Sequence, residues 1–252
     1  MSDKINIRGV LFDNTTLTDA TAQVAEHLAG GDGLFSVFTP NSEIVQLCIE
    51  HNEYYDLINS ASLIIPDGIG VIKASRILRT PLKEKVAGVE LGETTLKHCA
   101  EHGIGVFFLG AKPGVADEAA RVMAQKYPGL SICGTHDGYF NKVGEENDAV
   151  IDEIVASGAQ VLFVCLGVPA QEKWIYENRD HLNGVKIALA LGGSLDVYSG
   201  NVKRAPKLFI RLGLEWFYRL LKEPKRIGRM MKLPKFYFGT WLYRIKHERN
   251  RG

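Results

Sequence analysis

The chain lacks the sequence features that mark secreted and membrane-spanning proteins. Its four cysteines lie dozens of residues apart and form no CxxC pair, so a disulfide framework is not expected. No run of about 18 apolar residues is present, and the N-terminus has no charged segment leading into an apolar one. We therefore expect a cytoplasmic protein, without a membrane span or secretion signal, whose thiols stay reduced: Cys48, Cys99, Cys133 and Cys165.

Several common catalytic and cofactor motifs are missing as well. The sequence has no HExxH motif, no cluster of Cys and His at ligand spacing and no GxSxG motif, which disfavours zinc hydrolases and α/β-hydrolases. It has no DxD sequence to hold a metal-bound nucleotide diphosphate. A full GxGxxG followed by a suitably spaced acidic residue is also absent, which disfavours an NAD-dependent oxidoreductase. We expect neither a bound metal nor a cofactor.

What the chain does have is enough apolar sequence for a full core and an uneven distribution of charge. Its 252 residues are 46% hydrophobic, within the usual range of globular proteins. Residues 1–202 carry 15 basic and 26 acidic side chains, whereas residues 203–252 carry 15 basic and 3 acidic side chains, a net charge of +12. Such a segregated basic segment indicates an anionic partner: a phosphate-rich ligand, an acidic membrane or a nucleic acid.

Six short apolar runs alternate with longer segments of helical periodicity. The runs are nearly continuous in apolar residues, as required of strands whose two faces are both covered. Alternation of this kind predicts βαβ units and hence a Rossmann-like α/β domain over residues 1–202, with a mainly parallel sheet flanked by helices. The predicted strands lie within 34–38, 62–66, 104–110, 130–134, 161–167 and 185–193, and the clearest predicted helices are 43–59, 115–127, 145–156 and 171–182.

Residues 203–252 predict a second part, a basic helical appendage. Apolar residues recur at helical spacing through 208–221, and packing of a helix on the core would explain that stripe. It would not explain the scarcity of acidic residues or the aromatic cluster within 236–243, whereas a helix lying on a membrane surface explains both. We therefore expect a membrane-associating appendage of short helices, interrupted by Pro206, Pro224 and Pro234.

Polar residues directly after the apolar runs are the candidate site residues, because ligands of an open parallel sheet collect at the carboxyl ends of its strands. Thr39 and Asn41 follow the first run, and Asp67 follows the second. Asn41 also suits a plain helix N-cap. Asp67 fits either a cap of the next helix or a general base, and these residues alone leave both alternatives open.

Two further strand exits carry weaker signals. Gly110 opens a turn of small residues whose backbone N–H groups can face a phosphate, although the spacing matches no standard nucleotide motif. The exit after 161–167 contains Gln171 and Trp174, side chains that can border a base or sugar pocket. Pro169, in the same segment, is ordinary near the start of a helix.

Eight blocks of the sequence, taken in order, resemble the WecG/TagA/CpsF family of glycosyltransferases. The resemblance extends over nearly the whole chain, and eight ordered blocks are far more specific than any single motif. The blocks are TPNSEIV, PDGIGV, KVAGVEL, FFLGAKPGVA, GTHDGYF, LFVCLGVPAQEKWI, GGSLDVYSGNVKRAP and GLEWFYRLLKEPKR.

The resemblance implies an inverting, metal-independent transferase that takes a sugar from a UDP donor, characteristically N-acetylmannosamine. The implied acceptor is N-acetylglucosamine linked to undecaprenyl diphosphate, in teichoic acid or related cell-surface polysaccharide synthesis. The implied location is the cytoplasmic face of the cell membrane, as a peripheral protein on its anionic surface. N-acetylmannosaminuronic acid or glucuronic acid as the donor sugar stays an alternative, and self-association is left open.

The same resemblance assigns roles to individual residues. It implies that Asp67 is the general base that deprotonates the acceptor hydroxyl. Thr39 and Asn41 would line the same pocket and orient the substrate, and Gln171 would contribute to donor binding. The basic appendage would close over the site and supply cations to the diphosphate, for which the candidates are Arg211, Arg219 and Arg226.

Two positions depart from the family pattern. Lys85 stands where many relatives have arginine, and Glu90 stands where they often have aspartate. Lysine keeps the positive charge but loses the two-pronged guanidinium, so the expected contact of Lys85 with the diphosphate is weaker. A less favoured function is that of a noncatalytic anionic-ligand or nucleic-acid binder using the basic appendage, which leaves the acidic body and Asp67 without a role.

Overall fold

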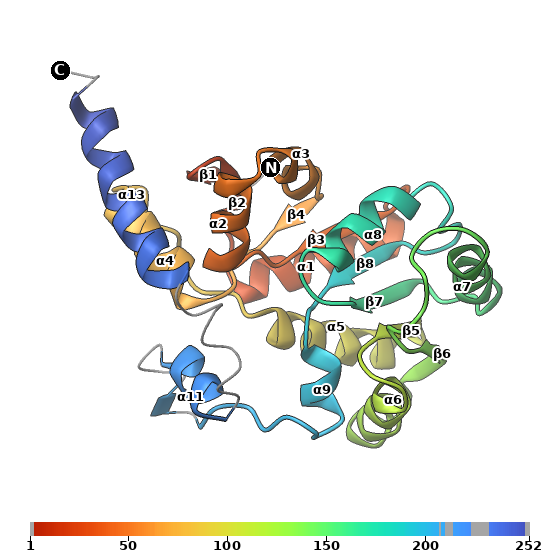
Figure 1. Cartoon of the computed structure of the whole chain (residues 1–252). Coiled ribbons are helices and arrows are strands. Elements are labelled where there is room, and N and C mark those ends of the chain that lie inside the picture. Colours follow the sequence, from red (N-terminus) through yellow and green to blue (C-terminus); the bar gives the residue numbers. More distant parts are fainter. Residues whose placement is uncertain (1–2, 207, 210–213, 223–231, 250–252) are drawn as a thin grey trace.

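A six-stranded parallel sheet forms the centre of the protein (Figure 1). The computed structural model describes residues 3–206, 208–209, 214–222 and 232–249. Five of the strands lie within predicted apolar runs, and the remaining one begins inside the run 130–134 and continues to His136. The predicted α/β fold with a mainly parallel sheet is therefore confirmed. In spatial order the strands are β4 (Leu63–Ile64), β3 (Phe35–Phe38), β8 (Ile187–Ala190), β7 (Val161–Cys165), β5 (Gly105–Gly110) and β6 (Ser131–His136).

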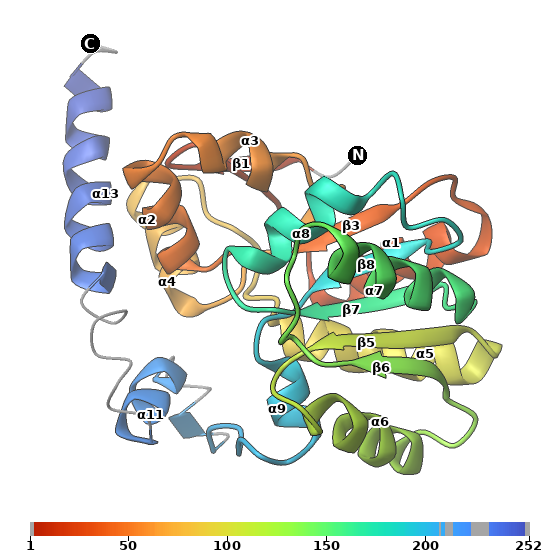
Figure 2. The same cartoon turned by 45° about the vertical axis from the view of Figure 1, so that its right-hand side comes forward.

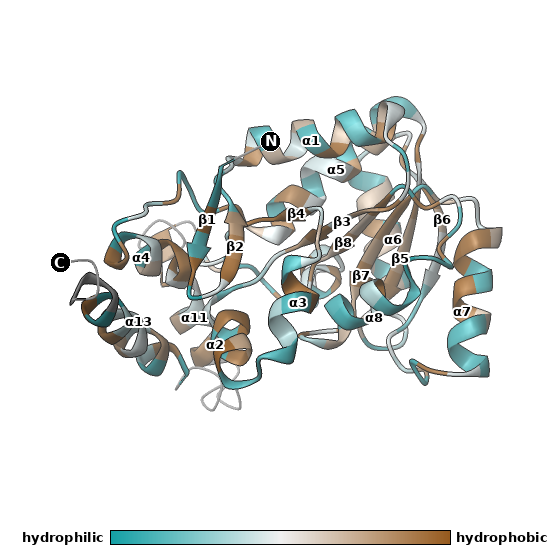
Figure 3. Cartoon of the chain, turned by 90° about the horizontal axis from the view of Figure 1, so that it is seen from above, coloured by the Kyte–Doolittle hydropathy of each residue, from teal (hydrophilic) through white to brown (hydrophobic). Residues whose placement is uncertain are grey.

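Helices cover both faces of the sheet, which explains why its central strands β8, β7 and β5 are almost entirely apolar. Along β5, Phe107 and Leu109 belong to one buried cluster, whereas Val106 and Phe108 belong to the other. Figures 1 and 2 show α7 and α8 over one face and α5 and α6 over the other, and Figure 3 shows the apolar strands between them. The first cluster includes residues of α2 (Ser42–Glu50), α3 (Glu53–Asn59), α4 (Ile69–Ile77), α7 (Glu145–Ala156) and α8 (Ala170–Asn178). The second includes residues of α1 (Leu17–Gly30), α5 (Gly88–His102), α6 (Val115–Lys126) and α9 (Ser194–Tyr198).

The predicted helices are confirmed in position, with two changes of length. The predicted helix over 43–59 is divided into α2 and α3, because the backbone of His51 is extended and turns the chain. The predicted helix over 171–182 ends at Asn178 as α8.

An N-terminal hairpin, for which the apolar runs gave no signal, extends the core beyond the sheet. Its strands are β1 (Lys4–Ile7) and β2 (Val10–Asp13), which pair antiparallel. Asp13 joins the hairpin to the sheet, because its carboxylate accepts hydrogen bonds from the Ile64 N–H at 2.8 Å and from Lys4 Nζ at 3.0 Å. The edge strand β4 is therefore tied to a side chain more than fifty residues away.

The appendage contains α11 (Glu215–Lys222) and α13 (Lys232–Arg249). Helix α13 lies against α2 and α4, with Phe236 and Thr240 fully buried (Figures 1 and 2). The expectation that Pro234 interrupts the helices is wrong, since Pro234 lies in the first turn of α13, where its missing N–H breaks no helical hydrogen bond. Over the ranges that the structure describes, none of the helices combines the length and the apolar character needed to cross a membrane.

Candidate active site at the carboxyl edge of the sheet

Three of the predicted site residues converge where β3 and β4 end. Thr39 follows β3 directly, and its hydroxyl donates to the carbonyl of Ala190 at the end of β8, at 2.9 Å. Asp67 follows β4 and is half-buried. Gly68 lies against Asn41, since a methyl group at Gly68 would be 3.7 Å from the Asn41 Cβ. Asp67, Thr39 and Asn41 therefore lie around one edge of the sheet, as the strand exits predict.

Gly88, at the start of α5, fills the space between Asp67 and Thr39. Its N–H donates to Asp67 Oδ2 in a long hydrogen bond of 3.4 Å. A methyl group at Gly88 would lie 3.1 Å from Thr39 Cγ2 and 3.3 Å from Leu191 Cδ2, so the helix approaches this closely only because the residue is glycine. The amino end of α5 thus orients one oxygen of Asp67.

Asn41 caps α2, as the simpler interpretation of its position suggests. Its side-chain oxygen accepts from the N–H groups of Glu43 at 2.8 Å and Ile44 at 3.2 Å. The cap fixes the turn that leads from β3 into α2 and holds the Asn41 side chain beside the segment that carries Asp67. Contact of Asn41 with a substrate stays a prediction.

Gln171 connects the exits of β7 and β8. Its Oε1 accepts from the Gly192 N–H at 2.9 Å, and its Nε2 donates to Glu172 Oε1 at 2.9 Å. The side chain is almost completely buried, so each end of its amide has a partner inside the protein. The sequence places Gln171 correctly at the carboxyl edge, while a direct contact with the donor stays a prediction.

Gly110 lies at the crevice between β5 and β7, where the chain leaves two adjacent strands in opposite directions. Its backbone has a φ of 125°, and a methyl group there would lie 2.4 Å from the backbone carbonyl of Cys165. The next residue, Ala111, donates its N–H to the same carbonyl at 3.0 Å. Only glycine permits this approach of the two strand ends. Contact of Gly110 with a phosphate stays a prediction.

Lys85 lies in the segment that runs beside Asp67. The following residue, Val86, donates its N–H to the Pro66 carbonyl at 3.1 Å, which places this segment next to the exit of β4. Lys85 is half-buried, and it too stays a candidate for diphosphate contact. Arg211 and Arg226 lie outside the described residues, as does the side chain of Arg219 in α11.

An ion pair at this edge escaped prediction. Arg204 forms an ion pair with Glu90 near the start of α5, so the first residues of the appendage are tied next to Asp67 and Gly88. Glu90 is one of the two departures from the family pattern, and its position alone gave no indication of its partner.

Glu172 is a buried carboxyl beside this edge. It is fully buried, and burial raises its pKa to about 7, against the lowering effect of the hydrogen bond from Gln171. Its charge contributes to the raised pKa of the Cys48 thiol in α2, which burial chiefly sets at about 12. In the sequence, a Gln-Glu-Lys run at a helix start is typical of a solvated surface, so nothing marked Glu172 as buried.

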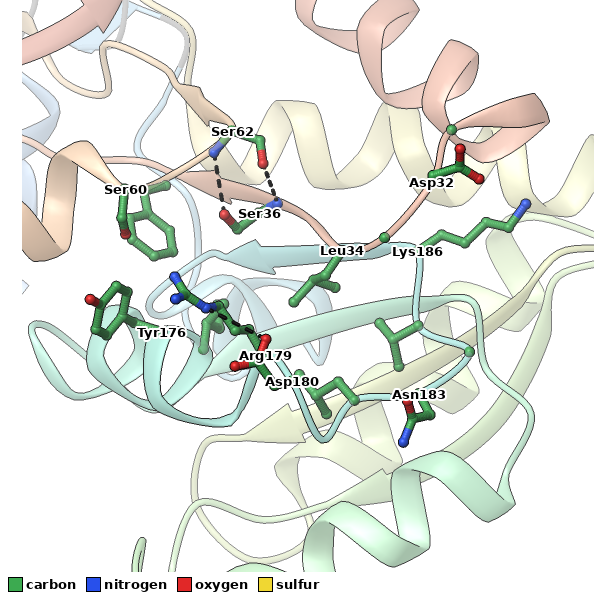
Figure 4. Close-up of a pocket in the computed structure, with 17 residues that line it drawn as sticks. Asp32, Leu34, Ser36, Ser60, Ser62, Tyr176, Arg179, Asp180, Asn183 and Lys186 are labelled. Carbon is green, nitrogen blue, oxygen red and sulfur yellow. Dashed lines mark hydrogen bonds and ion pairs between the residues drawn. The ribbon is translucent and has the colours of Figure 1, made fainter.

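A separate hollow of about 690 Å³ lies at the opposite edge, where β3, β4 and β8 begin (Figure 4). There Ser36 and Ser62 each accept the other's backbone N–H, at 3.2 and 3.3 Å, and Arg179 pairs with Asp180 at 3.8 Å. None of the predicted site residues lines it. Its size does not make it the active site, because strand direction places ligands of this fold at the other edge.

A parallel sheet with glycines at its strand exits, a half-buried aspartate and capped turns at its carboxyl edge defines a Rossmann-like α/β protein, and ligands of this fold collect at that edge. Across the described part of the chain, no three His, Cys, Asp or Glu side chains lie together as a metal site would require. The chain belongs to the glycosyl transferase WecG/TagA/CpsF family, whose profile matches residues 5–250.

Curated relatives agree with this family assignment. Proteins of Staphylococcus aureus strains MRSA252, MW2 and NCTC 8325 are each 38% identical to the chain over 237 residues, which is 93% of this chain and 91% of the relative. Each is named N-acetylglucosaminyldiphosphoundecaprenol N-acetyl-beta-D-mannosaminyltransferase. The resemblance drawn from the eight sequence blocks is therefore confirmed.

Proposed function

We propose that this chain is an inverting glycosyltransferase that moves N-acetylmannosamine from UDP to N-acetylglucosamine linked to undecaprenyl diphosphate. The family membership and the names of the relatives support the reaction class and both substrates. The observation that carries the proposal is the convergence of Asp67, Thr39 and Asn41 on the carboxyl edge of a parallel sheet.

The reaction is a single displacement at the anomeric carbon of the donor sugar. The acceptor hydroxyl oxygen forms a bond to that carbon as the bond to the UDP phosphate oxygen breaks, and the configuration inverts. Asp67 takes the proton of the attacking hydroxyl, and UDP leaves with the electron pair. The Gly88 N–H donates to one carboxylate oxygen of Asp67, Oδ2, in a long bond of 3.4 Å.

The departing diphosphate needs positive charge on the face opposite the base. Lys85 lies beside Asp67, and the Arg204–Glu90 ion pair ties the beginning of the basic appendage to the same region. Figures 1 and 2 draw α11 on the side of the molecule where α4 and α9 lie, the side to which the strand exits lead. Arg211, Arg219 and Arg226 are the further candidates for this role.

Contact with the membrane is assigned to the outer face of α13. Phe238 and Trp241 are 64% and 49% exposed, their rings stack at 6.3 Å, and Leu242 beside them is also exposed. These side chains lie opposite the buried Phe236, so the helix packs on the body with one face and offers an aromatic face to a lipid surface. These exposed side chains support our proposal of a peripheral position on the cytoplasmic face of the membrane, next to a lipid-linked acceptor.

The test is a transfer assay with the full chain, a panel of UDP-sugars and a short-chain lipid-diphosphate N-acetylglucosamine. We expect product from UDP-N-acetylmannosamine, with its anomeric configuration inverted when read by NMR. Transfer only from UDP-N-acetylmannosaminuronic acid or UDP-glucuronic acid would correct the donor, and no transfer from any of the three would contradict the proposal.

Binding to anionic vesicles tests the membrane assignment separately. Replacing both Phe238 and Trp241 by serine is expected to lower vesicle binding at least tenfold, because the two rings are the main apolar surface of that face. Tyr176→Ser, which removes an exposed aromatic side chain from α8, is the matched control. Equal binding by both variants would remove α13 from the membrane assignment.

A further inference from the structure

Glu172 is a buried acidic side chain that the transfer chemistry leaves without a task. It is the third residue of α8, directly after Gln171, and it has no exposed surface. Oε1 accepts from Gln171 Nε2, while Oε2 is buried without a hydrogen-bond partner. A buried carboxyl costs stability unless its hydrogen bonds are made, so a residue of this kind inside the core calls for a specific role.

Glu172 is connected through Gln171 to the turn after β8 that contains Gly192. A side-chain amide can face either way, and the carboxyl oxygen of Glu172 accepts only from the NH₂ end of Gln171. This fixes the opposite end, Oε1, toward the Gly192 N–H at 2.9 Å. Gly192 has a φ of 57°, in the left-handed region, so its N–H direction is set by a conformation that needs glycine.

A second connection leads from that turn to Asp67. Leu191, next to Gly192, lies in a groove formed by two glycines of α5: methyl groups at Gly88 and Gly92 would lie 3.3 and 2.9 Å from its side chain. Gly88 is the residue whose N–H holds Asp67. A shift of the turn therefore moves Leu191 against the first turn of α5 and changes the hydrogen bond to the candidate base.

We propose that Glu172 is a positioning residue, which orients the Gln171 amide and through it fixes the turn at Gly192 that supports Gly88 and Asp67. The inference rests on the proposed function for its consequence in catalysis, but the link from Glu172 to Gly192 is a property of the fold. Glu172 touches no substrate, because its side chain is fully buried.

Two substitutions separate this role from simple packing. Glu172→Gln keeps an oxygen that accepts from Gln171, whereas Glu172→Leu fills a similar space without an acceptor. Glu177→Gln, on the exposed side of the same helix, is the matched control. If Glu172→Leu does not fold, Gln171→Leu takes its place in the experiment, because it removes the same hydrogen bond from the Gln171 side.

The experiment measures amide hydrogen exchange by NMR and transfer kinetics on the full chain. In Glu172→Leu we expect the Gly192 amide to exchange at least tenfold faster, while the amides of Ala188 and Leu189 in β8 exchange at the native rate. We also expect kcat to fall at least tenfold, while UDP raises the Tm as much as in the native chain. Glu172→Gln is expected to stay within threefold of native in both readouts, and Glu177→Gln to match native.

Native exchange at Gly192 and native kcat in Glu172→Leu would overturn the proposal. So would equal losses in Glu172→Gln and Glu172→Leu, because the acceptor oxygen would then not matter. If the native chain transfers none of the sugars, the proposed function fails, and the exchange rates at Gly192 still decide whether Glu172 holds the turn.

Discussion

The two edges of the central sheet differ, and the volume of a hollow does not indicate which edge holds the active site. The amino edge holds the hollow of about 690 Å³, lined by serines and the Arg179–Asp180 pair. At the carboxyl edge, Thr39 and Leu191 lie close to Gly88 at the start of α5, and the N–H of Gly88 donates to Asp67. In a parallel sheet, the polar residues after the strands and the turns with unpaired N–H groups lie at the carboxyl edge. Strand direction, and not the volume of a hollow, therefore indicates where the active site lies.

The largest effect expected from this comparison concerns turnover. Asp67→Asn removes the group that accepts the proton and is expected to lower kcat by about 10²- to 10⁴-fold, the usual range for a general base. Arg179→Ala, in the hollow at the amino edge, should stay within twofold of native. Steady-state transfer kinetics measure both, with the UDP-dependent Tm as the check that each variant binds nucleotide. A larger loss in Arg179→Ala would reverse the roles of the edges.

The second largest effect is expected from adding a methyl group at Gly110, where two strand ends lie close together at the carboxyl edge. Gly110→Ala places a methyl group 2.4 Å from the Cys165 carbonyl at a φ of 125°. We expect a loss of about 2–4 kcal/mol in the free energy of unfolding, measured by urea denaturation. Gly30→Ala, at the end of α1 near the other edge, meets no atom within 4 Å and should change stability by less than about 0.5 kcal/mol. Equal losses would mean that the approach at Gly110 relaxes freely.

A smaller effect concerns the pH dependence contributed by Glu172. Its pKa of about 7 in the folded chain lies above the ordinary value of about 4.3. Between these two pH values the unfolded chain has lost a proton that the folded chain retains, so rising pH favours unfolding there, and the cost is constant above about pH 7. Glu172→Gln removes that cost.

The stability of Glu172→Gln relative to the native chain should therefore rise by roughly 2–3 kcal/mol from pH 5 to pH 8. Urea denaturation at a series of pH values measures the difference. Glu177→Gln is the control and should show no such trend, because its carboxyl is on the surface of α8. Parallel stability curves for Glu172→Gln and the native chain would contradict burial of the carboxyl.

The smallest expected effect is that of the ion pair between α13 and the body. Lys235 Nζ lies 2.6 Å from Glu50 Oε1, and its hydrogen bond is the main reason that the pKa of Glu50 is lowered. Because Lys235 is largely exposed, a double-mutant cycle with Glu50→Gln and Lys235→Met should give a coupling of about 0.2–1 kcal/mol that shrinks with added salt. A coupling of several kcal/mol would mean that charge, and not the buried Phe236, holds the helix.

Most of the sheet could be predicted from sequence, because strands covered on both faces are apolar at most positions. The runs around Phe107 and Leu162 stand out for that reason, and their exits locate Thr39, Asn41 and Asp67. The N-terminal hairpin could not be found this way. Its strands have four residues each, and its turn is formed by Arg8 and Gly9, without the Asn-Gly or Asp-Gly pair that marks such turns.

The interior of the site was less accessible to prediction than its location. Sequence shows that Gln171 lies at a strand exit, but the burial of its amide depends on Gly192, 21 residues away. Glu172 appears in a polar run at a helix start, where nothing local indicates that its carboxyl points into the core. Likewise, the pairing of Glu90 with Arg204 joins positions 114 residues apart. Contacts of this range follow from topology, which the local pattern does not contain.

The most direct measurement is hydrogen exchange of the native chain with and without UDP. We expect UDP to protect amides at the carboxyl edge, in the segments 39–42, 66–70, 85–88 and 110–112 and at Gly192, and to leave 31–36 and 182–186 at the amino edge unchanged. Protection confined to those amino-edge segments, with unchanged exchange around Asp67, would contradict this expectation.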